Sequence, residues 1–194
     1  MPSSTTLLFF LLFLLSFPHH HRHLLAAVAA DTALIQQTCK TTKHYDLCVS
    51  SLISDPTSLQ ASDAKGLAVI MITIGVANST ATSAYLSSQL PRSTSTTAAS
   101  DAAAAAAKKA VLKECAAKYG YAAEALQASA QDLVAESFDY ASMHVTAAAD
   151  YPNSCHNAFR GYPGFPYPPE IARREDGLKR ICDVVLGIID NLGW

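Results

Sequence analysis

VLKECAAKYGYAAEALQASAQDL, residues 111–133, decides the fold, because its apolar and small residues recur in alternating steps of three and four. Those positions are Leu112, Cys115, Tyr119, Ala122, Leu126, Ser129 and Leu133. This spacing places one continuous stripe along a helix, which is typical of a helix packed lengthwise against others. The stripe includes a cysteine, and a half-cystine inside a long helix indicates a crosslink to a neighbouring element. We therefore expect this helix to carry both the core of a bundle and a covalent tie.

Three further long helices are predicted around this stretch. The expected ranges are about 63–90, 140–159 and 169–193, with the central helix itself at about 102–136. The inward positions expected in the first of these helices are Leu67, Ile70, Met71, Ile74, Ala77, Ala81, Ala84 and Tyr85. No segment alternates apolar and polar residues with the period of a strand. The sequence therefore predicts an all-α protein, an antiparallel four-helix bundle.

The N-terminal residues carry a predicted secretory signal. Leu7 to Phe17 is an almost unbroken apolar run that is too short to span a bilayer, and small residues follow it up to Ala30. We expect cleavage near Ala30, which leaves residues 31–194 as one secreted domain without a membrane segment. The histidine tract before Ala30 could bind a metal, but it would be removed with the signal, so no metal site is predicted. No other cofactor is predicted either. The whole chain has a formal net charge of -2 and no basic patch that suggests nucleic acid.

All five cysteines lie in the expected mature chain, where an oxidising compartment favours disulfides. Spacing favours a local pair, Cys39 with Cys48, and a long-range pair, Cys115 with Cys155. The first pair would close a small loop between two short helical pieces within residues 33–53, and so clasp an N-terminal helical arm. Cys182 is then left as a free, buried thiol.

No catalytic arrangement is predicted. His44, His144 and His156 remain after signal removal, and none has a recognisable nucleophile and acid beside it in the pattern. The carboxylates are scattered, without a spaced pair on one helix face that would suggest general acid and base work. We therefore expect a protein that is not an enzyme.

Several segments together resemble the plant invertase and pectin methylesterase inhibitor family. They are Ile35-Gln36-Gln37-Thr38-Cys39, Tyr45-Asp46-Leu47-Cys48, Ser54-Asp55-Pro56, Cys115 with Tyr119, Ala147-Ala148-Ala149 before Cys155, and Cys182-Asp183-Val184-Val185-Leu186-Gly187. The resemblance covers essentially all of the expected mature chain. It implies a secreted four-helix bundle with an N-terminal helical hairpin, the two disulfides named above, and a role as an inhibitor of an enzyme in the apoplast, the cell wall or the vacuole.

The resemblance offers two targets. One branch of the family covers the pectin-binding cleft of pectin methylesterase in a one-to-one complex. The other branch blocks acid invertase with a Pro-Lys-Phe segment, and Phe138, Asp139 and Tyr140 occupy its positions here. The family's lysine is thus an acid in this chain, which favours pectin methylesterase, with cell-wall or vacuolar invertase as the alternative. A secreted bundle that only binds a ligand or has a structural role is a third possibility.

A target-binding surface follows from the same resemblance. Tyr121 and Glu124 are expected to face outward on the central helix and to meet the target together with Phe138, Asp139 and Tyr140. Ser154, just before Cys155, occupies the position of a family threonine. We expect inhibition by steric occlusion, with aromatic side chains as anchors. Asn78-Ser79-Thr80 is the one glycosylation sequon, on a predicted helix where occupancy depends on exposure.

Overall fold

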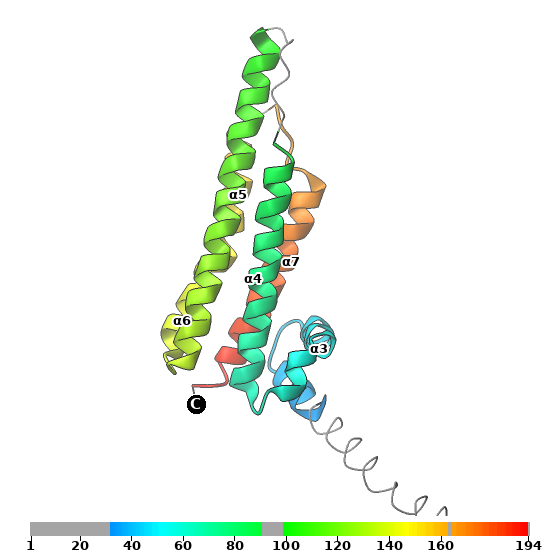
Figure 1. The fold of residues 1–194 in the computed structure, drawn as a ribbon, viewed down its shortest axis with the longest axis vertical. Helices are drawn as coiled ribbons and strands as arrows, with labels where there is room; N and C mark the ends of the chain where they lie inside the picture. Colours follow the sequence, from blue (N-terminus) through cyan, green and yellow to red (C-terminus); the bar gives the residue numbers. More distant parts are fainter. Residues whose placement is uncertain (1–31, 91–98, 163, 194) are drawn as a thin grey trace, which may run out of the picture.

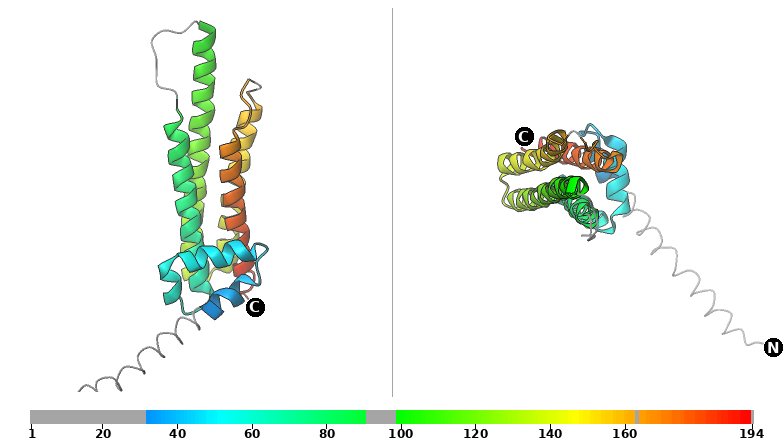
Figure 2. Two further views of the ribbon diagram at one scale, coloured as in Figure 1. Left: turned by 90° about the vertical axis from the view of Figure 1, so that its right-hand side faces the viewer. Right: turned by 90° about the horizontal axis from the view of Figure 1, so that it is seen from above.

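Four long helices form the body of the molecule (Figure 1). The computed structural model describes residues 32–90, 99–162 and 164–193. The helices are α4 (Ala64–Ser88), α5 (Ala99–Val134), α6 (Phe138–Arg160) and α7 (Pro169–Ile189), and the described ranges contain no strand. Each helix packs against the next, and α7 returns to pack against α4 (Figure 2). This confirms the predicted antiparallel four-helix bundle.

The inward stripe of α5 is as predicted, since all seven of its positions are buried. The helix begins earlier than expected, at Ala99, and its alanine-rich first turns project beyond the other helices (Figure 1). Side chains from Ala102 to Ala110 are exposed or half-buried there. Because alanine has the highest helix propensity, these turns are helical with little tertiary packing.

The buried stripe of α4 differs from the prediction. Its buried positions are Leu67, Ala68, Met71, Ile72, Gly75, Ser79, Thr82 and Leu86, whereas Ala77, Ala81 and Ala84 are exposed. The reason is the close approach of three helices at Gly75. A Cβ on Gly75 would lie 2.9 Å from Leu126 Cδ1 of α5 and 3.3 Å from Ile181 Cγ2 of α7. Small and hydroxyl-bearing residues therefore face the interior. The prediction followed the bulkier residues, so it assigned a partly different side of the helix to the interior.

The turn between α5 and α6 is a tight helix cap. Glu136 has a φ of 58°, in the left-handed region where glycine is usual. Ser137 N–H donates to the Asp132 carbonyl at 2.8 Å, and Glu136 N–H donates to the Leu133 carbonyl at 3.1 Å. These two bonds form a Schellman motif. Helix α6 then begins at Phe138, two residues before the predicted start.

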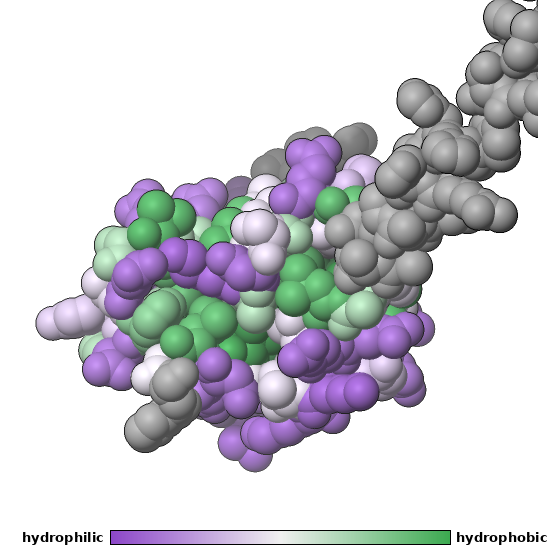
Figure 3. Space-filling model, turned by 90° about the horizontal axis from the view of Figure 1, so that it is seen from below, coloured by the Kyte–Doolittle hydropathy of each residue, from purple (hydrophilic) through white to green (hydrophobic). Residues whose placement is uncertain are grey.

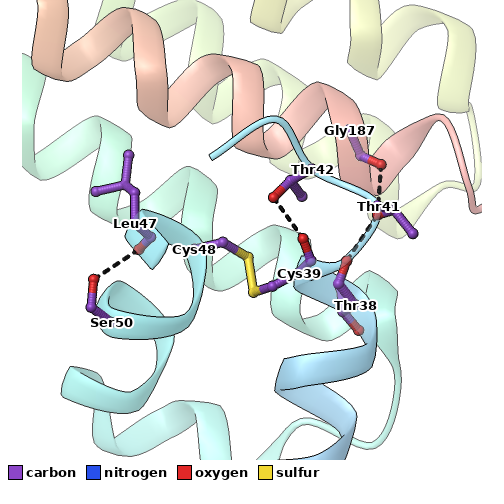
Figure 4. The surroundings of a disulfide bond; sticks show 8 residues. All are labelled: Thr38, Cys39, Thr41, Thr42, Leu47, Cys48, Ser50 and Gly187. Atoms are coloured by element: carbon purple, nitrogen blue, oxygen red, sulfur yellow. Dashed lines mark hydrogen bonds between the residues drawn. A yellow bond between two sulfur atoms is a disulfide. The ribbon is translucent and has the colours of Figure 1, made fainter. Parts of the chain in front are cut away.

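The N-terminal arm is a helical hairpin that crosses the base of the bundle (Figure 2). Residues 32–39 are helical, α3 spans Tyr45–Ser54, and a 3₁₀ helix, η1 (Pro56–Gln60), leads to α4. The Cys39–Cys48 disulfide joins the two arms of the hairpin (Figure 4). Thr41 Oγ1 donates to the Gly187 carbonyl of α7 at 3.0 Å, which fastens the hairpin loop to the bundle.

The second disulfide, Cys115–Cys155, joins α5 to α6 and closes a segment with a sequence separation of 40. A chain-entropy argument assigns about 4 kcal/mol to a loop of that length. Cys182 of α7 is a free, buried thiol, and burial raises its pKa to about 12. The thiol is therefore protonated at any physiological pH and inert as a nucleophile.

The predicted signal, residues 1–30, lies outside the described residues, as does the loop expected at Arg92–Thr97. Among the described helices, α4 alone is long and apolar enough to cross a membrane by length and composition. It packs inside the bundle against α5 and α7. A core helix of a water-soluble bundle passes the same test, so this property carries no membrane assignment.

Candidate functional site

The outer surface shared by α5 and α6 brings most of the predicted target-binding residues together. Two rows of residues with steps of four, three and four build it: Tyr121, Ala125, Ala128 and Asp132 on α5, and Tyr140, His144, Ala147 and Tyr151 on α6. Such steps return to the same side of a helix. We call this surface, together with the flanking residues Glu124, Met143 and Ser154, the α5–α6 face.

One end of the α5–α6 face is aromatic. The rings of Tyr121 and Tyr151 lie 5.7 Å apart between centroids and are tilted by 50°, in the range of favourable aromatic pairs. Tyr121 is 47% exposed, so its ring is held by a neighbour and still offers a surface. Glu124 is exposed on α5, and Ser154 is half-buried on α6.

The other end of the face is the turn that begins α6. Tyr140 is 61% exposed and Met143 is 65% exposed. One helical turn separates them, so the two large apolar side chains are neighbours on the surface. Behind them, His144 Nδ1 lies 2.7 Å from the Asp132 carboxylate, which ties α6 to α5. The exposed pair therefore stands on a helix junction fixed by the His144–Asp132 hydrogen bond and by the α5–α6 cap.

Phe138 and Asp139 have structural roles at this turn. Phe138 is half-buried against the core, and its Cδ2 lies 3.9 Å from where a Cβ on Gly193 would be. It is thus a packing residue more than a free anchor. Asp139 is exposed in the first turn of α6, where a negative charge stabilises the helix N-terminus by about 0.3–1 kcal/mol.

Two hollows open beside the turn at the base of the bundle. One, of about 350 Å³, is lined by residues 136–140 and Gly193. The other, of about 400 Å³, is lined by Phe138, Asp139, Ser142, Ile189, Asp190 and Gly193. Figure 3 views the molecule from this end and shows hydrophobic residues between rims of hydrophilic ones. The base therefore offers a concave, partly apolar surface next to the projecting Tyr140.

A larger hollow, of about 450 Å³, lies at α3 and the start of η1 and is lined mainly by Ser50, Ser51, Ser54, Asp55 and Pro56. The Asp55 carboxylate is engaged there, because it accepts hydrogen bonds from Thr57 N–H at 2.9 Å and from Thr57 Oγ1 at 2.6 Å. Those bonds lower the pKa of Asp55. The carboxylate in this hollow thus serves as the cap of η1.

A polar cluster between α6 and α7 was not predicted. Glu175 is only 8% exposed, and its carboxylate accepts hydrogen bonds from Tyr167 Oη at 2.9 Å and from Lys179 Nζ at 2.7 Å. His156 Nδ1 lies 3.4 Å from the same carboxylate. Burial by itself would raise the pKa of Glu175, but the bonds from Lys179 and Tyr167 lower it overall. Glu175 therefore stays ionised and holds the segment after α6 against α7.

Asn78 lies at the α4–α7 interface. Its Oδ1 is buried, and its Nδ2 lies 4.0 Å from where a Cβ on Gly177 would be. Ser79, the middle residue of the sequon, is fully buried. The sequon is thus folded into a helix interface.

Three observations mattered for the site and were missed at the sequence level: the partner ring of Tyr151, the exposure of Met143, and the buried Glu175. The first two follow from helical spacing, because Tyr151 and Met143 stand three or four residues from Tyr140, His144 or Ala147. Glu175 had no comparable signal, since a single carboxylate in a charged stretch is normally a solvated residue.

The geometry is that of a disulfide-tied helix pair that presents an exposed turn. Within the described residues, no group of three His, Cys, Asp or Glu side chains could hold a metal ion. The chain belongs to the plant invertase/pectin methylesterase inhibitor family, whose model matches residues 33–188. It is accordingly a member of a family of inhibitors and not an enzyme.

Named relatives agree with this family, and a solved structure has the same fold. The chain is 49% identical over 161 residues to "Cell wall / vacuolar inhibitor of fructosidase 2" of Arabidopsis thaliana, covering 83% of this chain and 84% of that protein. It is 40% identical over 157 residues to "Pectinesterase inhibitor 28" of Oryza sativa subsp. japonica, covering 81% and 68%. A pectin methylesterase inhibitor structure from Arabidopsis matches with a TM-score of 0.57 at 19% identity, covering 78% of this chain and 92% of that chain, which shows the shared fold.

Proposed function

We propose that this protein inhibits an acid fructosidase or a pectin methylesterase by covering the target's substrate cleft with the α5–α6 face in a one-to-one complex. The observation that carries the proposal is the adjacent exposed pair Tyr140 and Met143 at the start of α6. Large apolar side chains that project from a rigid element are typical anchors of an interface. The Cys115–Cys155 disulfide and the Asp132–His144 hydrogen bond fix the two helices before binding, which reduces the entropy lost on association.

Acid fructosidase, the invertase class, is the first target of the proposal. The relative named as an inhibitor of fructosidase shares 49% of aligned residues with this chain, against 40% for the relative named as a pectinesterase inhibitor. That difference extends over most of the domain, whereas the argument from the turn rests on three residues. For this reason we place acid fructosidase before pectin methylesterase, whereas the residues of the turn alone favoured pectin methylesterase.

Pectin methylesterase is the second target, and one feature favours it. Asp139 stands where the invertase-blocking branch of the family has a lysine, and its carboxylate is exposed with no ion pair among the described residues. An acidic group at the tip of the turn suits a cleft with basic groups. The two targets therefore differ in what they require of position 139.

The site of action that we propose is the cell wall or the vacuole, after removal of residues 1–30. Two disulfides support an oxidising, non-cytosolic compartment. The printed name of the fructosidase-inhibitor relative mentions both cell wall and vacuole.

The test is a parallel titration of purified residues 31–194 against an acid invertase and a pectin methylesterase, with residual activity measured across pH 4 to 7. We expect invertase activity to fall to a plateau at one inhibitor per enzyme. A fall in pectin methylesterase activity alone would assign the second target. If neither enzyme lost activity at any pH, the inhibitor proposal would be rejected in favour of a bundle with another binding role.

The variant Asp139→Lys separates the two targets further. We expect it to strengthen inhibition of invertase and to weaken inhibition of pectin methylesterase, because it restores the family's basic residue at the tip. The matched control is Asp176→Lys, an exposed acidic residue on α7, which should leave both activities unchanged. Equal effects of the two variants would show that net charge, not the turn, is responsible.

A further inference from the structure

The end of the bundle opposite the hairpin contains a small aromatic cavity outside the α5–α6 face. It has a volume of about 210 Å³ and is lined by His156, Phe159, Arg160, Tyr162, Phe165 and Tyr167. The first three residues belong to the last turn and a half of α6, and the others to the connection between α6 and α7, which Figure 2 shows at the top of the bundle. About 30 Å of helix separates Arg160 from Tyr140.

The cavity is built before any ligand arrives. His156 stacks on Tyr167 with centroids 4.2 Å apart and 12° between the planes, and Phe159 meets the same ring edge-on at 5.2 Å. The Tyr167 hydroxyl donates to the buried Glu175, which Lys179 also binds. The Tyr167 ring, which forms one wall of the cavity, is therefore fixed by His156, Phe159 and Glu175.

The opposite wall is fixed by backbone hydrogen bonds. Tyr162 N–H donates to the Phe159 carbonyl at 3.0 Å, and Phe165 N–H donates to the Tyr162 carbonyl at 2.9 Å. Tyr162 and Phe165 are both half-buried, so each ring keeps part of its surface accessible. The apolar walls and few polar groups are those of a small-molecule site, at a smaller volume than is usual for one.

Two basic side chains, Arg160 and His156, line the cavity. Arg160 is exposed and forms no ion pair or side-chain hydrogen bond within the described residues, so its guanidinium is available. His156 is the other basic group, and it already faces Glu175. A guanidinium binds a carboxylate through two parallel hydrogen bonds. The aromatic walls add stacking against a flat, apolar ring face.

We propose that this cavity binds a single six-membered ring that carries a carboxylate, with the ring against Tyr162, Phe165 and Tyr167 and the carboxylate on Arg160. The volume is enough for a ligand of about one ring, since water in the liquid occupies about 30 Å³ per molecule. A sugar acid and an aromatic acid share this chemistry. The site is independent of the inhibitory function proposed above.

The test is a nuclear magnetic resonance titration of uniformly ¹⁵N-labelled residues 31–194 with sodium galacturonate and with sodium benzoate. The neutral counterparts, methyl galactoside and benzyl alcohol, are titrated in parallel. We expect at least one acid to shift the amide signals of the residues that line the cavity, and the acid that does so identifies the source of the ligand. The proposal fails if neither acid shifts these signals, or if the neutral compounds bind as tightly as the acids.

Two variants locate the contacts. Arg160→Gln should weaken binding of the acid about tenfold or more, and Phe165→Ala should weaken binding of the acid and of its neutral counterpart alike. Arg180→Gln, another exposed arginine, on α7, should bind as the unmodified chain does. Unchanged binding by Arg160→Gln would overturn the proposal. Circular dichroism confirms the fold of each variant, and Arg160→Gln should inhibit the target enzyme normally, which keeps this test separate from that of the inhibitory function.

Discussion

Tyr140 concentrates the proposed binding energy in one side chain. Removal of an aromatic anchor typically costs 2 kcal/mol or more, so Tyr140→Ala should raise the inhibition constant about 30-fold. The ring is 61% exposed, so the substitution should leave the melting temperature unchanged. Tyr45→Ala is the matched control, because Tyr45 is a tyrosine exposed on the hairpin, away from the face. If the two variants inhibited equally, Tyr140 would not be an anchor.

Asn78 gives a second prediction for a single residue. Its Oδ1 is buried at the α4–α7 interface and Ser79 is fully buried, so a glycan on Asn78 would oppose the packing of α4 on α7. We expect secreted protein from plant or yeast cells to carry no N-linked sugar. Intact mass before and after treatment with an N-glycosidase measures this directly. A loss of mass on treatment would contradict the expectation and place Asn78 at the surface.

The contact of the hairpin with α7 depends on the absence of one methyl group. A Cβ on Gly187 would lie 3.0 Å from Thr42 Cα and 3.2 Å from the Thr41 carbonyl oxygen. Both are backbone atoms, so the hairpin itself would have to move. We expect Gly187→Ala to destabilise the chain by about 1–3 kcal/mol in urea unfolding, despite the gain in helix propensity.

The chain offers a matched control for that substitution. Gly120 also lies inside a long helix, and a Cβ there would meet no atom within 4 Å. Gly120→Ala should therefore stabilise the protein by about 0.5–1 kcal/mol, through helix propensity alone. If Gly187→Ala were as stabilising as Gly120→Ala, the hairpin would not be seated on α7 as described.

Whole elements were predictable where one periodic signal dominated. The stripe of α5 combines large apolar residues with a strict three-and-four spacing, so its seven positions could be assigned in advance. In α4 apolar residues occur on every side of the helix. Its buried side is set by the close approach of α5 and α7 at Gly75. That choice depends on partners far away in sequence. The cavity around Tyr167 could not be predicted for a different reason: the Tyr167 ring is held by the buried Glu175, whose burial leaves no signal in the sequence.

The stability of the molecule should depend on Glu175 through pH. Its pKa is lowered in the folded chain, so the unfolded chain binds this proton more tightly. The resulting stabilisation is fully present above the ordinary carboxyl pKa of about 4.3 and is lost as the pH falls through the lower folded value. Glu175→Gln should thus cost about 1–3 kcal/mol at pH 6 and progressively less below pH 4.

Chemical denaturation at a series of pH values measures that dependence. Glu124→Gln is the control, because Glu124 is exposed on α5 and has no ion pair within the described part of the chain. A constant difference between Glu175→Gln and the unmodified protein from pH 6 to pH 3 would show that the carboxylate contributes by packing and not by charge.

The Cys115–Cys155 disulfide also determines what a protease can do to the molecule. The exposed turn at Glu136–Tyr140 lies within the segment that this bond closes. A cut there would leave two pieces still joined by sulfur, with α5 and α6 still packed against each other. A nicked molecule should therefore run as one band on a non-reducing gel and as two after reduction. In a compartment rich in secreted proteases, such a protein would survive its first cleavage as a single particle.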